Sequence, residues 1–276
     1  MQGILESLIV LKILIGSSKK ATIGVIFVSD GESTDQAGIK AVIENRIFER
    51  EDRFIILDHA SENGSHVVVG EKSRIWIRFE INSTSQEEVN ALNASAEFFH
   101  GLDTRFREAF SNRNDLFEHP ASRFDLTLHE QNVDSISSVP RSEIQYSDIK
   151  LNPLYDPDLV LDLIHNECRE FENTHSVSIR TTVLGKKVSS MPLGGGSGVL
   201  KALSSAILRT RGFSPRAIGI DSGTPASVLR IENYDAAAWM SGDKDVLHSP
   251  NEYSRIMDIV EDVRTLLAIF SDSDAA

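Results

Sequence analysis

The chain has 276 residues, of which 41% are hydrophobic and 25% charged, and its formal net charge is −13. This length allows one large domain or two ordinary ones, and the composition is typical of a folded globular protein and excludes a disordered one. The acidic balance excludes a nucleic-acid-binding surface, because phosphate contacts require clustered lysine and arginine. The single cysteine, Cys168, excludes a disulfide framework and any multi-cysteine zinc site.

Residues 1–16 are apolar enough to predict a buried helix. Glu6 and Lys12 interrupt this run, which is also short and has no positively charged start. These features argue against a signal peptide. We therefore expect a cytoplasmic protein.

Strand, helix and strand patterns then follow one another over residues 21–30, 35–48 and 53–58. The first, "ATIGVIFVSD", is almost continuously apolar, which predicts a strand buried on both faces of a parallel sheet. Sites in such sheets lie where strands end. The two strand ends here carry Asp30-Gly31-Glu32 and Asp58-His59.

The pattern changes from about residue 70. Alternating strands are predicted at 73–81, 122–130, 142–151 and 176–185, and helices at about 86–111 and 156–171. Asp156 is placed to cap the second helix. This order predicts a split βαβ domain, in which a four-stranded antiparallel sheet carries two helices on one face.

The α/β pattern returns from about residue 187. We therefore predict a discontinuous α/β domain, residues 1–69 and 187–276, interrupted by an α+β domain at residues 70–186. Its final helix is expected over 250–270, starting at Ser249-Pro250. His248 precedes that helix and is either a metal ligand or a polar loop residue; the local sequence leaves both open.

The stretch "LHSPNEY" resembles the closing segment of the acetylornithine deacetylase/succinyl-diaminopimelate desuccinylase family of zinc metallopeptidases. "FVSDGES" and "ILDHAS" are similar to two acidic strand ends of that family, and the resemblance extends over essentially the whole chain. It implies a zinc-peptidase-like α/β catalytic domain with an inserted lid. In many members the lid is also the dimerisation domain, so the resemblance implies a homodimer, with no nucleic acid or membrane partner.

Carried over to this sequence, the family's metal ligands fall on Glu32, Asp58 and His248. The metal implied is zinc, or cobalt or manganese in its place. Carboxylate oxygen and imidazole nitrogen are ligands that zinc accepts. Two structural roles remain open: Glu32 as the cap of a helix that begins near Thr34, and Asp58 as an Asx-turn residue.

Departures from the family pattern are as informative as the matches. The family's metal-bridging aspartate and its His-x-Asp histidine correspond to positions before Met1, so this chain is expected to lack both ligands. Gly31 stands where the family has its general-base glutamate, and glycine transfers no proton. The lid histidine is missing, and His100 does not match its position.

The substrate contacts implied by the resemblance are also altered. Lys150 stands in place of an arginine that clamps the substrate carboxylate, and it lacks the bidentate fork. Of a Gly-Gly-Gly-Thr segment only Gly223 and Thr224 remain. The glycine run at 194–198 lacks the Gly-Lys-Ser/Thr ending of a phosphate loop, so we do not expect phosphate binding there.

We therefore expect a relative of metal-dependent amide hydrolases that holds its metal weakly or has lost it, and that is inactive as this chain. Two alternatives stay open. One is a non-catalytic dimeric binding or scaffold homologue. The other is an active hydrolase of N-acyl amino acids or peptides, completed by a separately encoded N-terminal segment.

Overall fold

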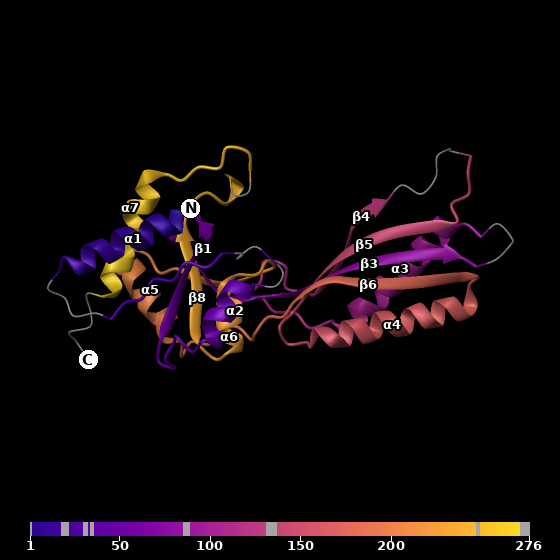
Figure 1. The fold of residues 1–276 in the computed structure, drawn as a ribbon, viewed down its shortest axis with the longest axis horizontal. Helices are drawn as coiled ribbons and strands as arrows, with labels where there is room; N and C mark the ends of the chain where they lie inside the picture. Colours follow the sequence, from indigo (N-terminus) through magenta and orange to yellow (C-terminus); the bar gives the residue numbers. More distant parts are fainter. Residues whose placement is uncertain are drawn as a thin grey trace. The chain divides into compact units, whose positions relative to one another are not determined.

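The computed structural model describes residues 2–17, 22–29, 33, 36–84, 89–130, 137–246 and 249–270. The chain forms two compact units (Figure 1). The first comprises Met1–Glu71 and Ser189–Ala276, and the second Lys72–Val188. The junctions lie two residues beyond those proposed from sequence. None of the described helices has the length and hydropathy needed to cross a membrane.

The first unit is built on a four-stranded sheet of order β1-β8-β2-β7. Its strands are β1 (Arg53–Ser61), β2 (His66–Glu71), β7 (Arg216–Ile220) and β8 (Asp235–Ser241). β1 runs parallel to β8 and β2 parallel to β7, but β2 and β8 are antiparallel. The carboxyl ends of β1 and β8 therefore share one end of the sheet, and those of β2 and β7 lie at the opposite end.

In the described part of this unit, five helices cover the sheet: α1 (Gln2–Ile15), α2 (Ala37–Glu44), α5 (Gly198–Arg211), α6 (Pro225–Ile231) and α7 (Ile256–Ile269). Figure 1 shows α1, α5 and α7 on one side of β8, and α2 and α6 on the other. Between the sheet and the helices α2 and α6, apolar residues that include Ile39, Leu229 and Ala238 are buried.

The strand expected at residues 21–30 is wrong for the part that the structure describes. Residues 22–29 form no strand, and Ile26 and Phe27 are 42% and 53% exposed. No described strand pairs with this segment, and an extended segment needs ladder partners to be stable. Strand β2, conversely, was not predicted.

Two helix predictions for the first unit also need correction. α1 is not a buried helix, because only Glu6, Val10 and Leu14 are buried, whereas Ile4 and Leu8 are about half exposed. α7 begins at Ile256 and not at residue 250. Asn251 has a φ of 64°, a left-handed conformation that a right-handed helix does not continue through.

The second unit matches the predicted split βαβ arrangement. Its antiparallel sheet has the order β4-β5-β3-β6, with strands β3 (Ser73–Ser83), β4 (Arg123–Glu130), β5 (Ser142–Leu151) and β6 (Val177–Lys187). Helices α3 (Ala91–Ala109) and α4 (Pro157–Thr174) pack on one face, where Ile77, Phe79 and Phe98 belong to one buried core. The Asp156 side chain caps α4 by accepting from the backbone N–H of Asp158.

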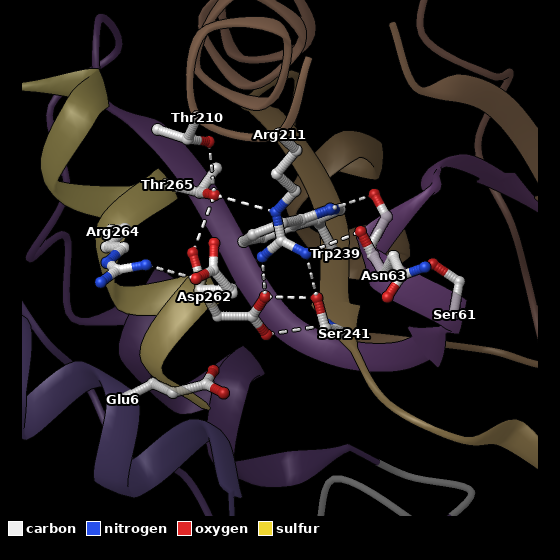
Figure 2. Close-up of polar contacts among 12 residues, drawn as sticks. Glu6, Ser61, Asn63, Thr210, Arg211, Trp239, Ser241, Asp262, Arg264 and Thr265 are labelled. Atoms are coloured by element: carbon white, nitrogen blue, oxygen red, sulfur yellow. Dashed lines mark hydrogen bonds and ion pairs between the residues drawn. The ribbon is translucent and has the colours of Figure 1, made fainter. Parts of the chain in front are cut away.

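A buried ionic cluster joins α5, α7 and the carboxyl end of β8 (Figure 2). The Arg211 guanidinium donates to Asp262 Oδ1 at 2.5 Å and to Ser241 Oγ at 2.8 Å. Asp262 also accepts from the backbone N–H of Ser241 at 2.7 Å. Arg211 lies over the Trp239 ring at 5.2 Å. Because a buried charge that loses its partner is costly, this cluster fixes the two helices to the strand end.

Glu6 of α1 is a second buried carboxyl group at this cluster. Its side chain is fully buried, and Oε1 accepts from Gln2 Nε2 at 2.7 Å. Burial, followed by the neighbouring Asp262 carboxylate, raises the pKa of Glu6 to about 8. Glu6 is therefore protonated in the folded chain over a range in which an exposed glutamate is ionised.

This raised pKa predicts a stability that falls with pH. Between about pH 4.5 and about pH 8 the folded state holds a proton that the unfolded state releases, so the free energy of unfolding declines as pH rises. In Glu6→Gln the amide stays neutral, and we expect a shallower decline and higher stability than the wild type at about pH 9. Urea unfolding of both proteins at several pH values between about 4.5 and about 9 measures how the free energy of unfolding changes with pH. Glu44→Gln, an exposed change on α2, is the control, and an equally steep decline in Glu6→Gln would refute the assignment.

Candidate functional site

Asp58 lies where β1 departs from regular pairing with β8. Three residues lie between Ile56 and Ala60 on β1, opposite the one residue between Ala238 and Met240 on β8, so β1 carries a bulge. His59, inside the bulge, has a φ of 60°. Bulges often occur beside active sites, where they re-aim a side chain. The local geometry therefore makes this strand end the strongest site candidate in the first unit.

The Asp58 carboxylate is only partly used by the fold. Its Oδ1 accepts from the backbone N–H of His59 at 2.7 Å, one residue further along the chain and not the two residues of an Asx turn. Its Oδ2 has no hydrogen-bond partner among the described residues. One oxygen of Asp58 thus remains available to a ligand.

The loop that carries His248 begins at the same end of the sheet. β8 ends at Ser241 beside the carboxyl end of β1, and the short helix η2 (Lys244–Val246) contacts β1. Ser249 Oγ donates back to the Val246 carbonyl at 2.6 Å. Val246 and Ser249 are thereby placed, while Leu247 and His248 lie outside the described residues.

Glu32 and the general-base position Gly31 also lie outside the described residues. Nearby, Ser33 Oγ accepts from the backbone N–H of Gln36, and α2 begins only at Ala37. The predicted ligand set is therefore represented in the structure by Asp58 alone. In the described part of the chain no group of three or more His, Cys, Asp or Glu side chains could hold a metal ion. The described residues by themselves do not form a zinc site.

Gly223 and Thr224 lie at the opposite end of the sheet from Asp58. They follow the carboxyl end of β7, which runs parallel to β2 and against β8. The Thr224 hydroxyl is buried and donates to Glu71 Oε1 at 2.5 Å. The structure therefore does not bring these two residues together with Asp58, and Thr224 has a role in the core.

Glu71 in turn forms a buried ion pair with Arg230. Arg230 also donates to the Ala236 carbonyl at 2.7 Å and to Ser190 Oγ at 3.3 Å. Burial lowers the pKa of Arg230 to about 10. This second ionic cluster holds the amino end of β8, as the Arg211 cluster holds its carboxyl end.

Lys150 belongs to the second unit, on the sheet face not covered by α3 and α4. Its ammonium group lies 2.9 Å from Asp125 Oδ2 and 3.1 Å from Asp148 Oδ2. Arg74 binds the same Asp148 carboxylate at 2.6 Å. Lys150 is therefore held between two carboxylates of its own sheet.

The glycine run at 194–198 is not an open anion site. Asp235 Oδ2 accepts from the backbone N–H groups of Gly198 and Val199 at 2.7 and 2.9 Å, and Ser197 Oγ donates to Oδ1 at 2.6 Å. The helix N-terminus that would attract a phosphate already holds this carboxylate. This agrees with the expectation from sequence.

The sequence reasoning did not find the two buried clusters. One signal was present, because Glu6 interrupts an otherwise apolar helix. Asp262 is similar, since it lies beside Val263 and Leu266 on the buried side of α7. A lone acid on an apolar helix face predicts a buried partner. That partner, Arg211, could not be identified from spacing because it lies on another helix.

The position of Thr224 predicts a structural role that mutation can test. Thr224→Val removes the donor to a buried carboxylate, which should lower the free energy of unfolding by about 1–3 kcal/mol. Ser222→Ala, an exposed change two residues away, should have little effect. Urea unfolding of both variants measures the difference, and equal stability would show that the Thr224–Glu71 bond contributes nothing.

Comparison with known proteins gives the family. The model for "Peptidase family M20/M25/M40" matches residues 1–272. An uncharacterized metallohydrolase of Methanocaldococcus jannaschii is 28% identical over 284 residues, covering 94% of this chain and 68% of that protein.

Solved structures show the same fold. A tripeptidase from Staphylococcus aureus superposes with a TM-score of 0.75 at 15% identity, over 98% of this chain and 69% of its own. The aminopeptidase PepT of Bacillus cereus gives 0.73 at 14% identity, over 98% and 70%. Because the family model matches nearly the whole length of this chain, the chain belongs to peptidase family M20/M25/M40.

Proposed function

We propose that this chain carries part of a divalent-metal site for amide hydrolysis, with Glu32, Asp58 and His248 as its ligands. Two carboxylates and one imidazole suit zinc, and also cobalt or manganese. When bound, such an ion polarises a carbonyl group and activates water. The substrate class is N-acyl amino acids or short peptides, in keeping with family membership and with relatives described as peptidases.

The observation that carries this proposal is the end of the sheet formed by β1 and β8. There Asp58 sits on a bulge with one carboxylate oxygen unpaired, and the loop that leads to His248 contacts the same strand. Parallel neighbours deliver their following loops to one place, which is where α/β folds assemble sites.

We further propose that this chain alone does not turn over substrate. Gly31 occupies the position at which the family's general base is expected, and loss of a general base typically lowers the rate by ~10²–10⁴-fold. The specific subgroup suggested by the sequence, acetylornithine deacetylases and desuccinylases, is one candidate source of substrate within the family.

A second candidate function is a non-catalytic binding or scaffold protein on the same fold. The contacts of Lys150 and Thr224 favour it, because both expected substrate-binding side chains are engaged in internal networks. A protein that binds without turnover needs no general base at position 31 and no complete metal site.

Zinc content and hydrolysis, measured on one preparation, test the first proposal. We expect weak zinc binding that disappears in the triple variant Glu32→Ala, Asp58→Ala, His248→Ala, because all three proposed ligands are removed. We expect no hydrolysis of N-acetyl and N-succinyl amino acids or dipeptides.

The matched control likewise replaces two carboxylates and one histidine, at exposed positions: Glu44→Ala, Glu51→Ala and His100→Ala. It should keep the zinc content of the wild type. Equal zinc in all three proteins would remove the metal proposal. Turnover that a chelator abolishes would instead show that the chain is active by itself.

We also propose that two copies of this chain form a homodimer, and that the interface lies in the second unit. β6 is an edge strand there and exposes Val183 and Leu184, which suits strand-to-strand contact with a second copy. We expect a dimer mass by light scattering, and a monomer mass for Val183→Lys with Leu184→Lys. Leu159→Lys, an exposed change on α4, should stay dimeric. A wild-type monomer, or a dimer that survives the β6 changes, would exclude this interface.

A further inference from the structure

Glu6 and Asp262 bring two carboxyl groups into one buried cluster with Arg211. Both carboxyl side chains are fully buried, and the Arg211 side chain is nearly so. In Figure 2 the Asp262 carboxylate lies between Glu6 and Arg211, and a side-chain hydrogen bond joins the two acids. Two carboxylates that share one site do not both ionise without a large cost. The pair therefore retains one proton.

Hydrogen bonds decide which of the two acids holds this proton. Asp262 accepts from the Arg211 guanidinium at 2.5 Å, and from the backbone N–H and the hydroxyl of Ser241 at 2.7 and 2.5 Å. These donors stabilise a carboxylate at Asp262. Glu6 accepts from the neutral side-chain amide of Gln2 at 2.7 Å. The proton therefore stays on Glu6, whose O–H group can donate to Asp262.

The amino-terminal half of α1 depends on Glu6 for its attachment. Glu6 is the buried side chain of that half, where Ile4 and Leu8 are about half exposed. The other half is held by apolar contact, because Val10 and Leu14 are buried. A charge on Glu6 would therefore weaken the attachment of the first half and leave the second half in place.

The first residues of α1 also cover the sheet end that carries Asp58. Besides its bond to the buried acid, Gln2 donates to the Ser241 carbonyl at the end of β8, at 2.9 Å. Gly3 lies so close to β1 that a Cβ on it would be 2.8 Å from Leu57 Cβ. Leu57 directly precedes Asp58 in the chain. The attachment of α1 thus decides whether the strand beside the candidate site is covered.

We propose that the proton shared by Glu6 and Asp262 controls a local opening, in which its loss releases the amino-terminal half of α1 from α7 and from the end of β8. Without that proton the cluster holds two negative charges beside the one positive charge of Arg211. The charged groups that act on Glu6 are Asp262 of α7 and Arg211 of α5, and on β1 the helix meets the apolar Leu57. The opening exposes Leu57 while the remainder of the first unit keeps its fold. It does not depend on metal binding or on hydrolysis.

Hydrogen exchange measures this opening. The backbone N–H groups of residues 6–9 donate within the first turns of α1, so they exchange when this half of the helix opens. Burial, followed by the Asp262 carboxylate, raises the pKa of Glu6 from 4.5 to about 8, so opening releases a proton between these values. We expect the protection factors of residues 6–9 to fall about tenfold per pH unit from about pH 6 to about pH 8, and to level off above it. Amides of β8, an interior strand, should stay at least about 100-fold more protected at each pH.

Glu6→Gln is the critical variant. Its side-chain amide stays uncharged at every pH and can donate to Asp262 as the protonated acid does, so the protection of residues 6–9 should not change with pH. Glu44→Gln, at an exposed position of α2, should keep the tenfold slope of the wild type. Infrared spectra at about pH 6 give a second measurement. The wild type should show the C=O band of a buried protonated carboxyl group, and Glu6→Gln should lack it.

Three results would contradict the proposal. The first is equal protection of residues 6–9 and of β8, since α1 would then open only when the whole unit unfolds. The second is an unchanged pH slope in Glu6→Gln, which would assign the proton to another group. The third is the absence of a carboxyl band that Glu6→Gln removes, because Glu6 would then be ionised in the folded chain.

Discussion

Buried arginine–carboxylate pairs at the two ends of β8 are the constraint on which the first unit depends. Arg211 joins α5 to Asp262 of α7 and to Ser241 at the carboxyl end of the strand. Arg230 joins α6 to Glu71 of β2 and to the Ala236 carbonyl at the amino end. Replacing one partner would leave a buried charge uncompensated, which is strongly destabilising. Each pair therefore fixes the helices and strands that meet at its end of the sheet.

Strand direction then decides where chemistry can be located. β1 and β8 run one way and β2 and β7 the other, so residues that follow β1 cannot meet residues that follow β7. Asp58 is at the first end and Thr224 at the second. The two residues are similar in sequence terms, since each follows or ends an apolar strand beside a polar turn. Only the antiparallel contact between β2 and β8 separates their roles.

Much of the fold could be predicted from sequence, because its elements show clear periodicity. The polar–apolar alternation in β3 and the capped helix α4 allowed the split βαβ arrangement of the second unit to be predicted correctly. The expected strand at 21–30 was wrong in its described part, since a strand depends on a ladder partner that its own residues do not encode. β2 was missed because its apolar run, Val67–Val69, is only three residues long. For the site, the sequence identified Asp58 at a strand end, but neither the bulge nor the internal partners of Lys150 and Thr224 leave a local pattern.

The Arg230 cluster has a consequence for the two points at which the chain passes between the units. Glu71 is the last residue of the first unit before one passage, and Ser190 is the second residue after the return. Arg230 binds both side chains, and the Leu193 N–H donates to the Val69 carbonyl at 2.8 Å, so the two passages are tied together. Bending at Glu71 would break a buried ion pair, which the surrounding core resists. The two passages therefore leave the first unit from one tied segment of it.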